Sequence, residues 1–536
     1  MKTLLLIGAT ALFCSVACMS QQRSTTVYDV REYGAKGDGI TLDTKAIQRA
    51  IDDCGSTGGV VVFARGTFLT GSLELKSNTE LRIESGATIL GSKNLSDYAE
   101  HVPRLKSYNN IFLKYSLLYA EGQSNISITG RGTIDGQGSA FKVVSNEKPE
   151  RYKNRPYGIR FIECKNVLVE NITLRNSAMW MQHYLACEGV TIRGVRVFNH
   201  ANKNNDMMDI DGCKNVIVSD CTGDTDDDGI TLKSTSDRIT EDVSIANCVI
   251  SSHCNAIKTG TESTGGFKNI AISNIVIVPS SVETVMSGQP GGTSGISLTL
   301  VDGGVMDGIS ISNVVMDGPA VPIFVRLGNR ARKYWEGAPV PGVGLVKNVV
   351  ISHVTAHHVK TTGCSITGIE GHAIEGISLN DIRLEFAGGI TESSNKEVQE
   401  LADQYPEATM WGTLPSYGFY IRHVSGLQIH NLILDFDRED VRPAMILDDV
   451  VDAKIDGLDA KIWKGGGSAL VLENVRGLML SGSSLRGKAN ALLKLIGDKN
   501  ERISVGWNDL RVVKQVCDPL SALGNSVYSF ENQMSH

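Results

Sequence analysis

The fold is decided by a short phrase that the chain repeats, as in residues 166–176, NVLVENITLRN, and residues 189–199, GVTIRGVRVFN. Apolar and polar residues alternate, a small or turn-forming residue interrupts them, and the alternation resumes. A period of two places successive side chains on opposite faces of a β-strand. The phrase recurs at residues 215–224, 242–251, 269–278, 308–317, 348–357, 376–385, 426–435 and 477–486.

The spacing of the repeats indicates how the strands are arranged. The first apolar residues of successive phrases are 23, 26, 27, 27, 39, 40 and 28 residues apart, at Val167, Val190, Val216, Val243, Ile270, Ile309, Val349 and Ile377. Strands that recur every 20 to 30 residues between Gly, Asn and Asp turns are typical of a parallel β-helix. A β-propeller needs longer, four-stranded repeats, and a leucine-rich repeat needs helical segments. We therefore predict one all-β domain over residues 25–536.

Two further features of the solenoid follow from this pattern. The two spacings near 40 residues predict inserted loops at about 279–295 and 328–344. At the start, a cap is expected over about residues 25–60. There, LDTKAIQRAIDDCGSTGG (42–59) predicts a short helix with Asp43 as N-cap and Gly55 at its end. Its apolar stripe consists of Ala46, Ile47, Ala50, Ile51 and Cys54.

The N-terminal sequence MKTLLLIGATALFCSVACMSQQ indicates export. Lys2 precedes an apolar run, Leu4 to Val16, that is too short to span a bilayer, so residues 1–18 are predicted to be a signal peptide. The SVAC that ends at Cys18 also resembles a bacterial lipoprotein box; ordinary cleavage after Ala17 is the alternative. We expect the periplasm or the outer membrane of a bacterium, with a lipid on Cys18 as the only membrane attachment.

Charge and cysteine placement narrow the function classes. The formal net charge of −7 does not point to a nucleic-acid partner, and an anionic substrate would need local Lys and Arg. Of the eleven cysteines, several recur at equivalent places in successive repeats, which predicts stacked buried thiols rather than disulfides. These are Cys164, Cys187, Cys213, Cys221 and Cys248.

Residues 204–234, NNDMMDIDGCKNVIVSDCTGDTDDDGITLKS, contain eight acidic side chains. DTDDDG resembles the start of an EF-hand calcium loop, but Thr235 stands where that loop needs Glu, and the flanks are strands. We therefore expect no metal and no cofactor. A solvated turn is the simplest alternative, and Asp226 is interpreted as a turn residue.

Spacing instead favours a catalytic cluster. Asp206 and Asp227 are 21 residues apart, about one coil, so they should lie on neighbouring rungs about 4.8 Å apart. Asp228 adds a third carboxyl, and His253 follows one rung later. Several carboxyls on one patch can divide the acid and base work of glycoside hydrolysis, and mutual repulsion keeps a proton on one of them.

At these motifs the chain resembles glycoside hydrolase family 28, the polygalacturonase-like enzymes. NND (204–206) stands at the family's N-T-D, DDDGITLKS (226–234) at its G-D-D phrase, and SHC (252–254) at its G-H-G. Residues 28–51 and 176–192 are also similar to pectin-active proteins. The resemblance implies a right-handed, pectin-lyase-like β-helix and an inverting hydrolase. Asp227 would then be the general acid, Asp206 and Asp228 would activate water, and His253 would support the cluster or bind sugar.

The resemblance also implies a pectic substrate with galacturonide or rhamnogalacturonan linkages, and exo action is one possibility. However, the family's R-I-K motif aligns with Ser297-Leu298-Thr299. Lys258 and Arg326 are therefore candidates to bind a substrate carboxylate, with Arg330 as a further one. For Lys258 the alternative is a solvated strand residue, and for Arg326 a tie between a loop and its coil.

Three more residues are candidate sugar contacts. They are Asn204, Lys233, which should face outward by alternation with its strand neighbours, and His183. For Lys233 an ion pair with the aspartates is the alternative, and for His183 burial in the core. Two other functions remain open at this point: a calcium-dependent pectate lyase and a non-catalytic glycan-binding β-helix. We expect a monomer whose partner is a pectic oligo- or polysaccharide.

Overall fold

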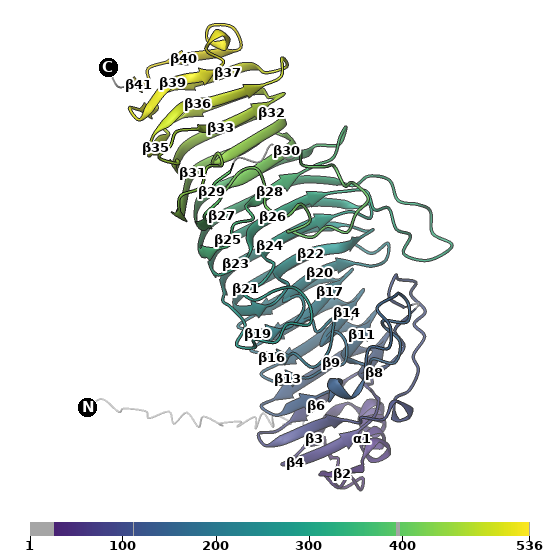
Figure 1. The fold of residues 1–536 in the computed structure, drawn as a ribbon. Coiled ribbons are helices and arrows are strands. Elements are labelled where there is room, and N and C mark those ends of the chain that lie inside the picture. The colour runs from purple at the N-terminus through teal and green to yellow at the C-terminus, as the bar shows by residue number, and fades with distance from the viewer. Residues whose placement is uncertain (1–25, 111, 393–396, 535–536) are drawn as a thin grey trace, which may run out of the picture.

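The computed structural model describes residues 26–110, 112–392 and 397–534. In this part of the chain, strands wind into one long parallel β-helix, whose coils are stacked from α1 (Thr44–Thr57) at one end to β40 and β41 at the other (Figure 1). Its winding is right-handed, the hand that parallel crossovers almost always take. The predicted fold class is confirmed. The predicted signal peptide at residues 1–18, with Cys18, lies outside the described residues.

The coils build three faces, and a single long strand can span more than one of them. The first face contains β1 (Val27–Asp29), β3 (Gly59–Phe63), β6 (Thr79–Ile83), β9 (Ser124–Gly130), β12 (Lys165–Glu170), β15 (Glu188–Arg193), β18 (Lys214–Ser219), β21 (Thr240–Ser252), β23 (Phe267–Ile277), β25 (Val305–Asp317), β27 (Leu345–Val359), β29 (Ile374–Gly388), β31 (Gln428–Arg438), β32 (Met445–Lys461), β34 (Arg476–Ser481), β37 (Glu501–Gly506) and β40 (Val527–Phe530).

The second face is built from short strands and from the ends of the longer ones. It contains β2 (Asp38–Leu42), β4 (Gly66–Thr70), β7 (Ala87–Gly91), β10 (Thr133–Asp135), β13 (Thr173–Arg175), β16 (Arg196–Asn199), β19 (Thr222–Thr225), β35 (Ser484–Arg486), β38 (Asp509–Leu510) and β41 (Gln533–Met534). From β21 onward, long strands bend from the first face into the second, as β21 does when its last residues pair with β19.

The third face carries the residues of functional interest. It contains β5 (Leu73–Glu74), β8 (Ser116–Glu121), β11 (Tyr157–Ile162), β14 (Gln182–Leu185), β17 (Met208–Asp211), β20 (Ile230–Ser234), β22 (Asn255–Ser263), β24 (Ser294–Leu300), β26 (Val321–Leu327), β28 (Cys364–Thr367), β30 (Phe419–Ser425), β33 (Ser468–Glu473), β36 (Ala489–Ile496) and β39 (Val513–Asp518). Between β30 and β33, the first residues of β32 continue this face.

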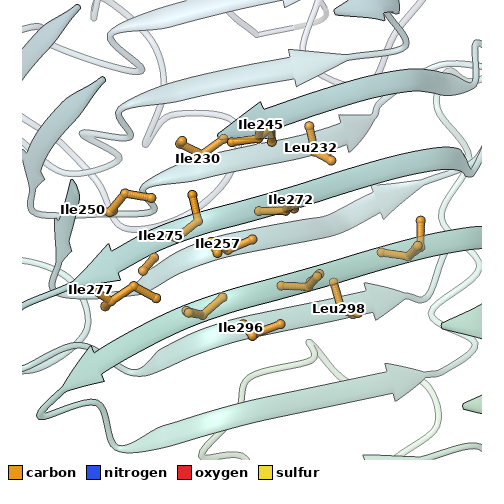
Figure 2. Close-up of a cluster of buried hydrophobic side chains, with 14 of the residues drawn as sticks. Ile230, Leu232, Ile245, Ile250, Ile257, Ile272, Ile275, Ile277, Ile296 and Leu298 are labelled. Atoms are coloured by element: carbon orange, nitrogen blue, oxygen red, sulfur yellow. The ribbon is translucent and has the colours of Figure 1, made fainter. Parts of the chain in front are cut away.

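The register of the first face is the one that the repeats predict. Each residue of the predicted series pairs with the next, from Val167 with Val190 through to Val349 with Ile377. On the third face, Ile230, Ile257 and Ile296 form a similar row. Figure 2 shows these side chains stacked with those of the facing strands in the interior. Identical apolar positions on successive coils thus form one continuous core.

Asparagines produce the bend between the first and second faces. Asn247, Asn274 and Asn313 have φ values of 57°, 57° and 55°, a left-handed conformation that Asn tolerates better than most residues. Their side chains form a ladder along the helix axis: Asn274 Nδ2 donates to Asn247 Oδ1 at 3.1 Å, and Asn313 Nδ2 donates to Asn274 Oδ1 at 3.2 Å. The small polar residue inside each repeat therefore marks a corner.

Helix α1 packs over the first coils; of its predicted stripe, Ile47, Ala50, Ile51 and Cys54 are buried and Ala46 is half-buried. Asp43 is the N-cap residue, as predicted, but its carboxylate does not cap the helix, because it accepts the backbone N–H groups of Lys36 and Gly37, at 2.8 and 2.9 Å. The predicted end was wrong: the helix continues past Gly55 and ends before Gly58, whose φ of 78° suits glycine.

The thiols are buried and free, as predicted, at Cys54, Cys164, Cys187, Cys213, Cys221, Cys248, Cys254, Cys364 and Cys517. Long connections leave the coils at 278–293 and 328–344, and a third, which the repeat spacing did not reveal, runs through 389–418. Among the described residues, no helix has both the length and the apolar character needed to cross a membrane.

Candidate active site

The register of the third face places the acidic motifs on adjacent rungs. Met208 pairs with Ile230, so Asp206 and Asp228, each two residues earlier, are equivalent positions. Ile230 pairs with Ile257, which places Asn255 next in the same row. Asp206 and Asp227 therefore lie on neighbouring rungs, as predicted, but Asp228 rather than Asp227 is in register with Asp206. The row of equivalent positions is Asp206, Asp228 and Asn255.

Asp206, Asp227 and Asp228 line one cavity of about 460 Å³. It lies outside the third face, where the turns that precede β17, β20 and β22 meet the longer connections. Its walls combine residues that are far apart in the sequence: Tyr108, Lys148, Arg151, Tyr152, Trp180, Met286, Tyr405 and Glu407. The cavity is thus formed jointly by the coils and by loops that fold back over them.

Of Asp206, Asp227 and Asp228, Asp228 has the most complete set of hydrogen-bond donors. Its Oδ1 accepts hydrogen bonds from Asn255 N and Nδ2, at 3.2 and 2.7 Å, and its Oδ2 lies 2.8 Å from Lys258 Nζ. Burial acts to raise the pKa of Asp228, but the charges of Lys258 and Lys233 and these hydrogen bonds outweigh it and lower the pKa. Asp228 is therefore held in the ionised form.

Asp227 and Asp206 have the opposite environment. Burial and the neighbouring Asp228 raise the pKa of Asp227, whose Oδ1 accepts only the N–H of Asp228, at 3.0 Å, among the described residues. Burial and the charges of Asp209, Asp227 and Asp228 raise the pKa of Asp206 well above its usual value, and Asp206 Oδ1 has no partner in the described chain. The cavity therefore holds carboxyls that prefer different protonation states.

Lys233 and Lys258 both line the cavity and both are buried. Lys233 Nζ lies 3.6 Å from Asp209 Oδ1 and 3.5 Å from Glu262 Oε2, so it faces away from the core, as alternation predicts. Lys258 is not a solvated strand residue, because its ammonium pairs with Asp228. Each lysine thus balances carboxylates at the site.

His253 does not line the cavity. Ile230 pairs with Ile257, so His253 is the rung equivalent of Asp226 and lies beside it, with 3.0 Å between Nδ1 and Asp226 Oδ1. Its Nε2 donates to Val282 O at 2.9 Å in the 278–293 connection. His253 is 1% exposed, so a direct sugar contact, as the sequence suggested, is wrong for this side chain.

Two other predicted sugar contacts are also wrong. His183 is fully buried, with Nε2 3.0 Å from Asp211 Oδ2, and it does not reach the cavity. Arg326 is 1% exposed and also lies outside the cavity lining. Its guanidinium donates to Gly368 O at 3.0 Å and to Glu400 O at 2.5 Å. Arg326 therefore ties the 389–418 connection to the coils, which is the structural alternative considered above.

Asn204 does line the cavity, where its Oδ1 accepts a hydrogen bond from Arg155 Nη2 at 3.1 Å. Arg330 lies outside the cavity lining; its Nε donates to Asp302 Oδ1 at 3.0 Å. None of the residues at the position of the family's R-I-K motif supplies a cation. Apart from Lys258, the substitutes proposed from the sequence are thus engaged elsewhere.

The cavity residues that the sequence did not indicate include Lys148, Arg151, Tyr405 and Glu407. Lys148 Nζ lies 5.7 and 5.5 Å from the ring centroids of Tyr108 and Tyr152, and no described carboxylate pairs with it or with Arg151. Arg151 Nε is buried without a hydrogen-bond partner. Because all four residues lie in connections without a repeat, no periodic signal marks them.

The model of glycosyl hydrolases family 28 matches residues 55–404. A probable polygalacturonase from Vitis vinifera is 29% identical over 287 residues, which cover 50% of this chain and 57% of that protein. The exo-poly-α-D-galacturonosidase of Dickeya chrysanthemi is 32% identical over 252 residues, or 38% of this chain and 41% of that protein. The chain thus spans about half the length of these relatives.

Among solved structures, the hyperthermoactive exopolygalacturonase from Thermotoga maritima has a TM-score of 0.59 at 22% identity, covering 76% of this chain and 92% of that one. This likeness supports the fold. The family model covers well over half of the chain and includes Asp206, Asp227, Asp228 and His253. The chain belongs to glycosyl hydrolases family 28.

Proposed function

We propose that the protein is an exported, inverting glycoside hydrolase that removes galacturonide units from one end of pectic glycans. The observation that carries the proposal is the convergence of Asp206, Asp227 and Asp228 on one cavity where only Asp228 has a cation in contact. Family membership supports hydrolysis of an O-glycosyl bond rather than elimination or binding alone.

In this mechanism, Asp227 donates its proton to the oxygen of the leaving sugar, and the Asp228 carboxylate accepts a proton from the attacking water, which Asp206 helps to orient. One oxygen of Asp227 lies within 4.8 Å of one of Asp228, which is shorter than the roughly 6.5–9.5 Å usual between acid and base in inverting enzymes. The base side of the reaction therefore relies on Asp206, one rung away from Asp228, to place the water.

Lys148 and Arg151 would recognise the uronate carboxylate in place of the missing R-I-K motif. They are the cavity cations that no described carboxylate neutralises, whereas Lys233 and Lys258 have acidic partners. Because a guanidinium can bind a carboxylate through two parallel hydrogen bonds, the unpartnered Nε of Arg151 suits this task. A neutral sugar would leave both cations without a counter-charge.

Exo action is supported by the walls of the cavity. Tyr405 and Glu407 come from the 389–418 connection, and Lys148 and Arg151 come from the 136–156 connection on the N-terminal side. Loops on both sides of the carboxyls favour a pocket for a chain end over an open groove. The relative from Dickeya chrysanthemi, named as an exo-acting enzyme, agrees with this proposal.

The N-terminal 18 residues support export, with the periplasm or a lipid anchor at Cys18 as the destination, and we propose a monomer as the active form.

The test is release of galacturonic acid from oligogalacturonides by wild type, Asp227→Asn and the control Asp220→Asn. Asp220 is a corner residue next to β19, away from the cavity. Because general acid catalysis contributes about 10²–10⁴-fold, Asp227→Asn should lose at least about 10²-fold in kcat, while Asp220→Asn stays near wild type. Equal activity of wild type and Asp227→Asn, or products with unsaturated ends, would refute the proposal.

A further inference from the structure

Next to the catalytic rung, two histidines and an aspartate form a buried cluster that does not line the cavity. A possible ligand atom from each of His200, Asp226 and His253 lies within 4.8 Å of those of the other two. Their side chains are 6%, 0% and 1% exposed. The hydrolytic mechanism uses none of them directly, so the cluster needs a separate explanation.

Hydrogen-bond accounting fixes the protons on both imidazoles. His200 Nε2 lies 2.9 Å from Asp224 Oδ1, so it donates, and Nδ1 keeps an unshared electron pair with no partner in the described chain. His253 Nε2 donates to Val282 O, which can only accept. A neutral His253 therefore turns the unshared pair of Nδ1 toward Asp226 Oδ1, 3.0 Å away.

In the part of the chain that the structure describes, His200 Nδ1 and His253 Nδ1 are thus both acceptors without a donor, and Asp226 adds further acceptor oxygens to the cluster. Its Oδ1 already accepts Met286 N at 2.8 Å, and its buried Oδ2 has no hydrogen-bond partner among the described residues. A proton shared between His253 and Asp226 would satisfy only one contact and would leave His200 Nδ1 and Asp226 Oδ2 unsatisfied. A cation between the three side chains would satisfy all of them.

We propose that His200, Asp226 and His253 bind a divalent transition metal, with Zn²⁺ as the ion that the ligand set suits best. Two imidazoles and a carboxylate are ligands typical of Zn²⁺, and a water completes a tetrahedral site. The 3.0 Å between His253 Nδ1 and Asp226 Oδ1 is close to the ligand–ligand edge of about 3.3 Å that bonds of about 2.0 Å require.

The surroundings of the ligands have the features of an outer coordination shell. Metal-bound histidines usually donate their second N–H to a carboxylate or a backbone carbonyl, as His200 does to Asp224 and His253 does to Val282. Asp224 is itself held by Ser280 Oγ and Ser281 N, at 2.6 and 3.0 Å. The orientation of both imidazoles is therefore fixed without the metal.

The position of the site indicates a structural task. Val282 and Met286 belong to the 278–293 connection, whose residues Met286, Ser287 and Gly288 line the cavity, and Asp226 directly precedes Asp227. A metal here joins this loop to the rung that carries the catalytic carboxyls. We expect it to stabilise the cavity wall without contacting the substrate.

The experiment uses the untagged protein, loaded with Co²⁺ or Zn²⁺. The expected result is visible Co²⁺ absorption that saturates at one equivalent, displaced by Zn²⁺, and a Tm that rises with Zn²⁺ and falls with a chelator. His200→Gln and Asp226→Asn should each lower the affinity at least about 10-fold. His183→Gln is the matched control, because His183 also pairs with a buried aspartate but has no third ligand beside it.

The wild-type spectrum does not depend on whether a variant folds. No Co²⁺ absorption and no change in Tm at saturating Zn²⁺ would overturn the proposal. Equal loss of affinity in folded His200→Gln and His183→Gln would also overturn it, since the ion would then be bound elsewhere. Unchanged metal affinity in both His200→Gln and Asp226→Asn would likewise overturn the proposal.

Discussion

At the residue scale, neighbouring groups differentiate side chains of the same type. Asp228 is held ionised by Lys258 and Asn255, whereas Asp227, the adjacent residue, has no cation in contact and keeps a raised pKa. Lys258 is paired, whereas Lys148 has the rings of Tyr108 and Tyr152 near its ammonium and forms no ion pair with a described carboxylate. These differences follow from the rung and loop positions of the side chains, and they support the proposed division between catalysis and substrate binding.

The first prediction concerns substrate charge. Arg151→Ala should raise KM for oligogalacturonides about 10- to 100-fold, because a hydrogen-bonded pair with a charged group contributes about 1.5–3 kcal/mol. Lys153→Ala is the control, since Lys153 pairs with Glu150 on the surface. Steady-state kinetics measure KM for both variants, and Lys153→Ala should stay near wild type. An unchanged KM in Arg151→Ala would show that the uronate is bound by other groups.

The second prediction concerns pH and stability. Burial lowers the pKa of His183 from 6.5 in spite of the adjacent Asp211. The unfolded chain therefore binds this proton more readily, so the stability contributed above about pH 6.5 is lost as the pH falls. His183→Gln, which cannot titrate, should lose less unfolding free energy than wild type between about pH 7 and 5. Urea denaturation at both pH values measures these losses. Equal losses of unfolding free energy in wild type and His183→Gln would contradict the prediction.

The sequence predicted the carboxyl cluster but not every contact around it. Asp206, Asp227 and Asp228 follow from motif and coil spacing, because strand register transmits sequence spacing into space. His183 and Arg326 were misplaced, since alternation shows which side chains leave the core but not whether a loop later covers them. Arg326 is buried by contacts with Glu400, 74 residues further along the chain.

At the element scale, the coils are predictable and the loops are not. Every pair in the series from Val167 to Ile377 lies in the predicted register, because a one-residue slip would expose the apolar row. The 389–418 connection has no period, yet it reaches back to place Tyr405 near Lys258 of β22. Such a return depends on tertiary contacts, which a repeat pattern does not encode.

The third prediction tests this loop. Tyr405 is 50% exposed and its ring lies 5.8 Å from Lys258 Nζ, so it offers an aromatic face to a sugar. Tyr405→Ala should raise KM about 5- to 30-fold, equivalent to about 1–2 kcal/mol, with a smaller change in kcat. Tyr528→Ala, at an exposed tyrosine of β40, is the control. Equal kinetics of the two variants would remove Tyr405 from the substrate site.

At the scale of the whole molecule, stability is distributed along the solenoid, because each coil packs mainly on its neighbours. Ile257 is 1% exposed between Ile230 and Ile296, so Ile257→Ala leaves a cavity in the row and should cost about 2–5 kcal/mol of unfolding free energy. Ile217→Ala, at a side chain 52% exposed, should stay within about 0.5 kcal/mol. Chemical denaturation compares them, and equal losses would contradict the continuous core.

The same stack holds Asp227, the proposed acid, and Asp206 and Asp228, the proposed water-binding carboxyls, in fixed relative positions. The most direct measurement is an NMR time course of the anomeric proton of the first galacturonic acid released. Direct attack by water predicts that the product appears first as the β-anomer and then mutarotates. Initial release of the α-anomer would contradict the account, because it would require a covalent intermediate on one of the cavity carboxyls.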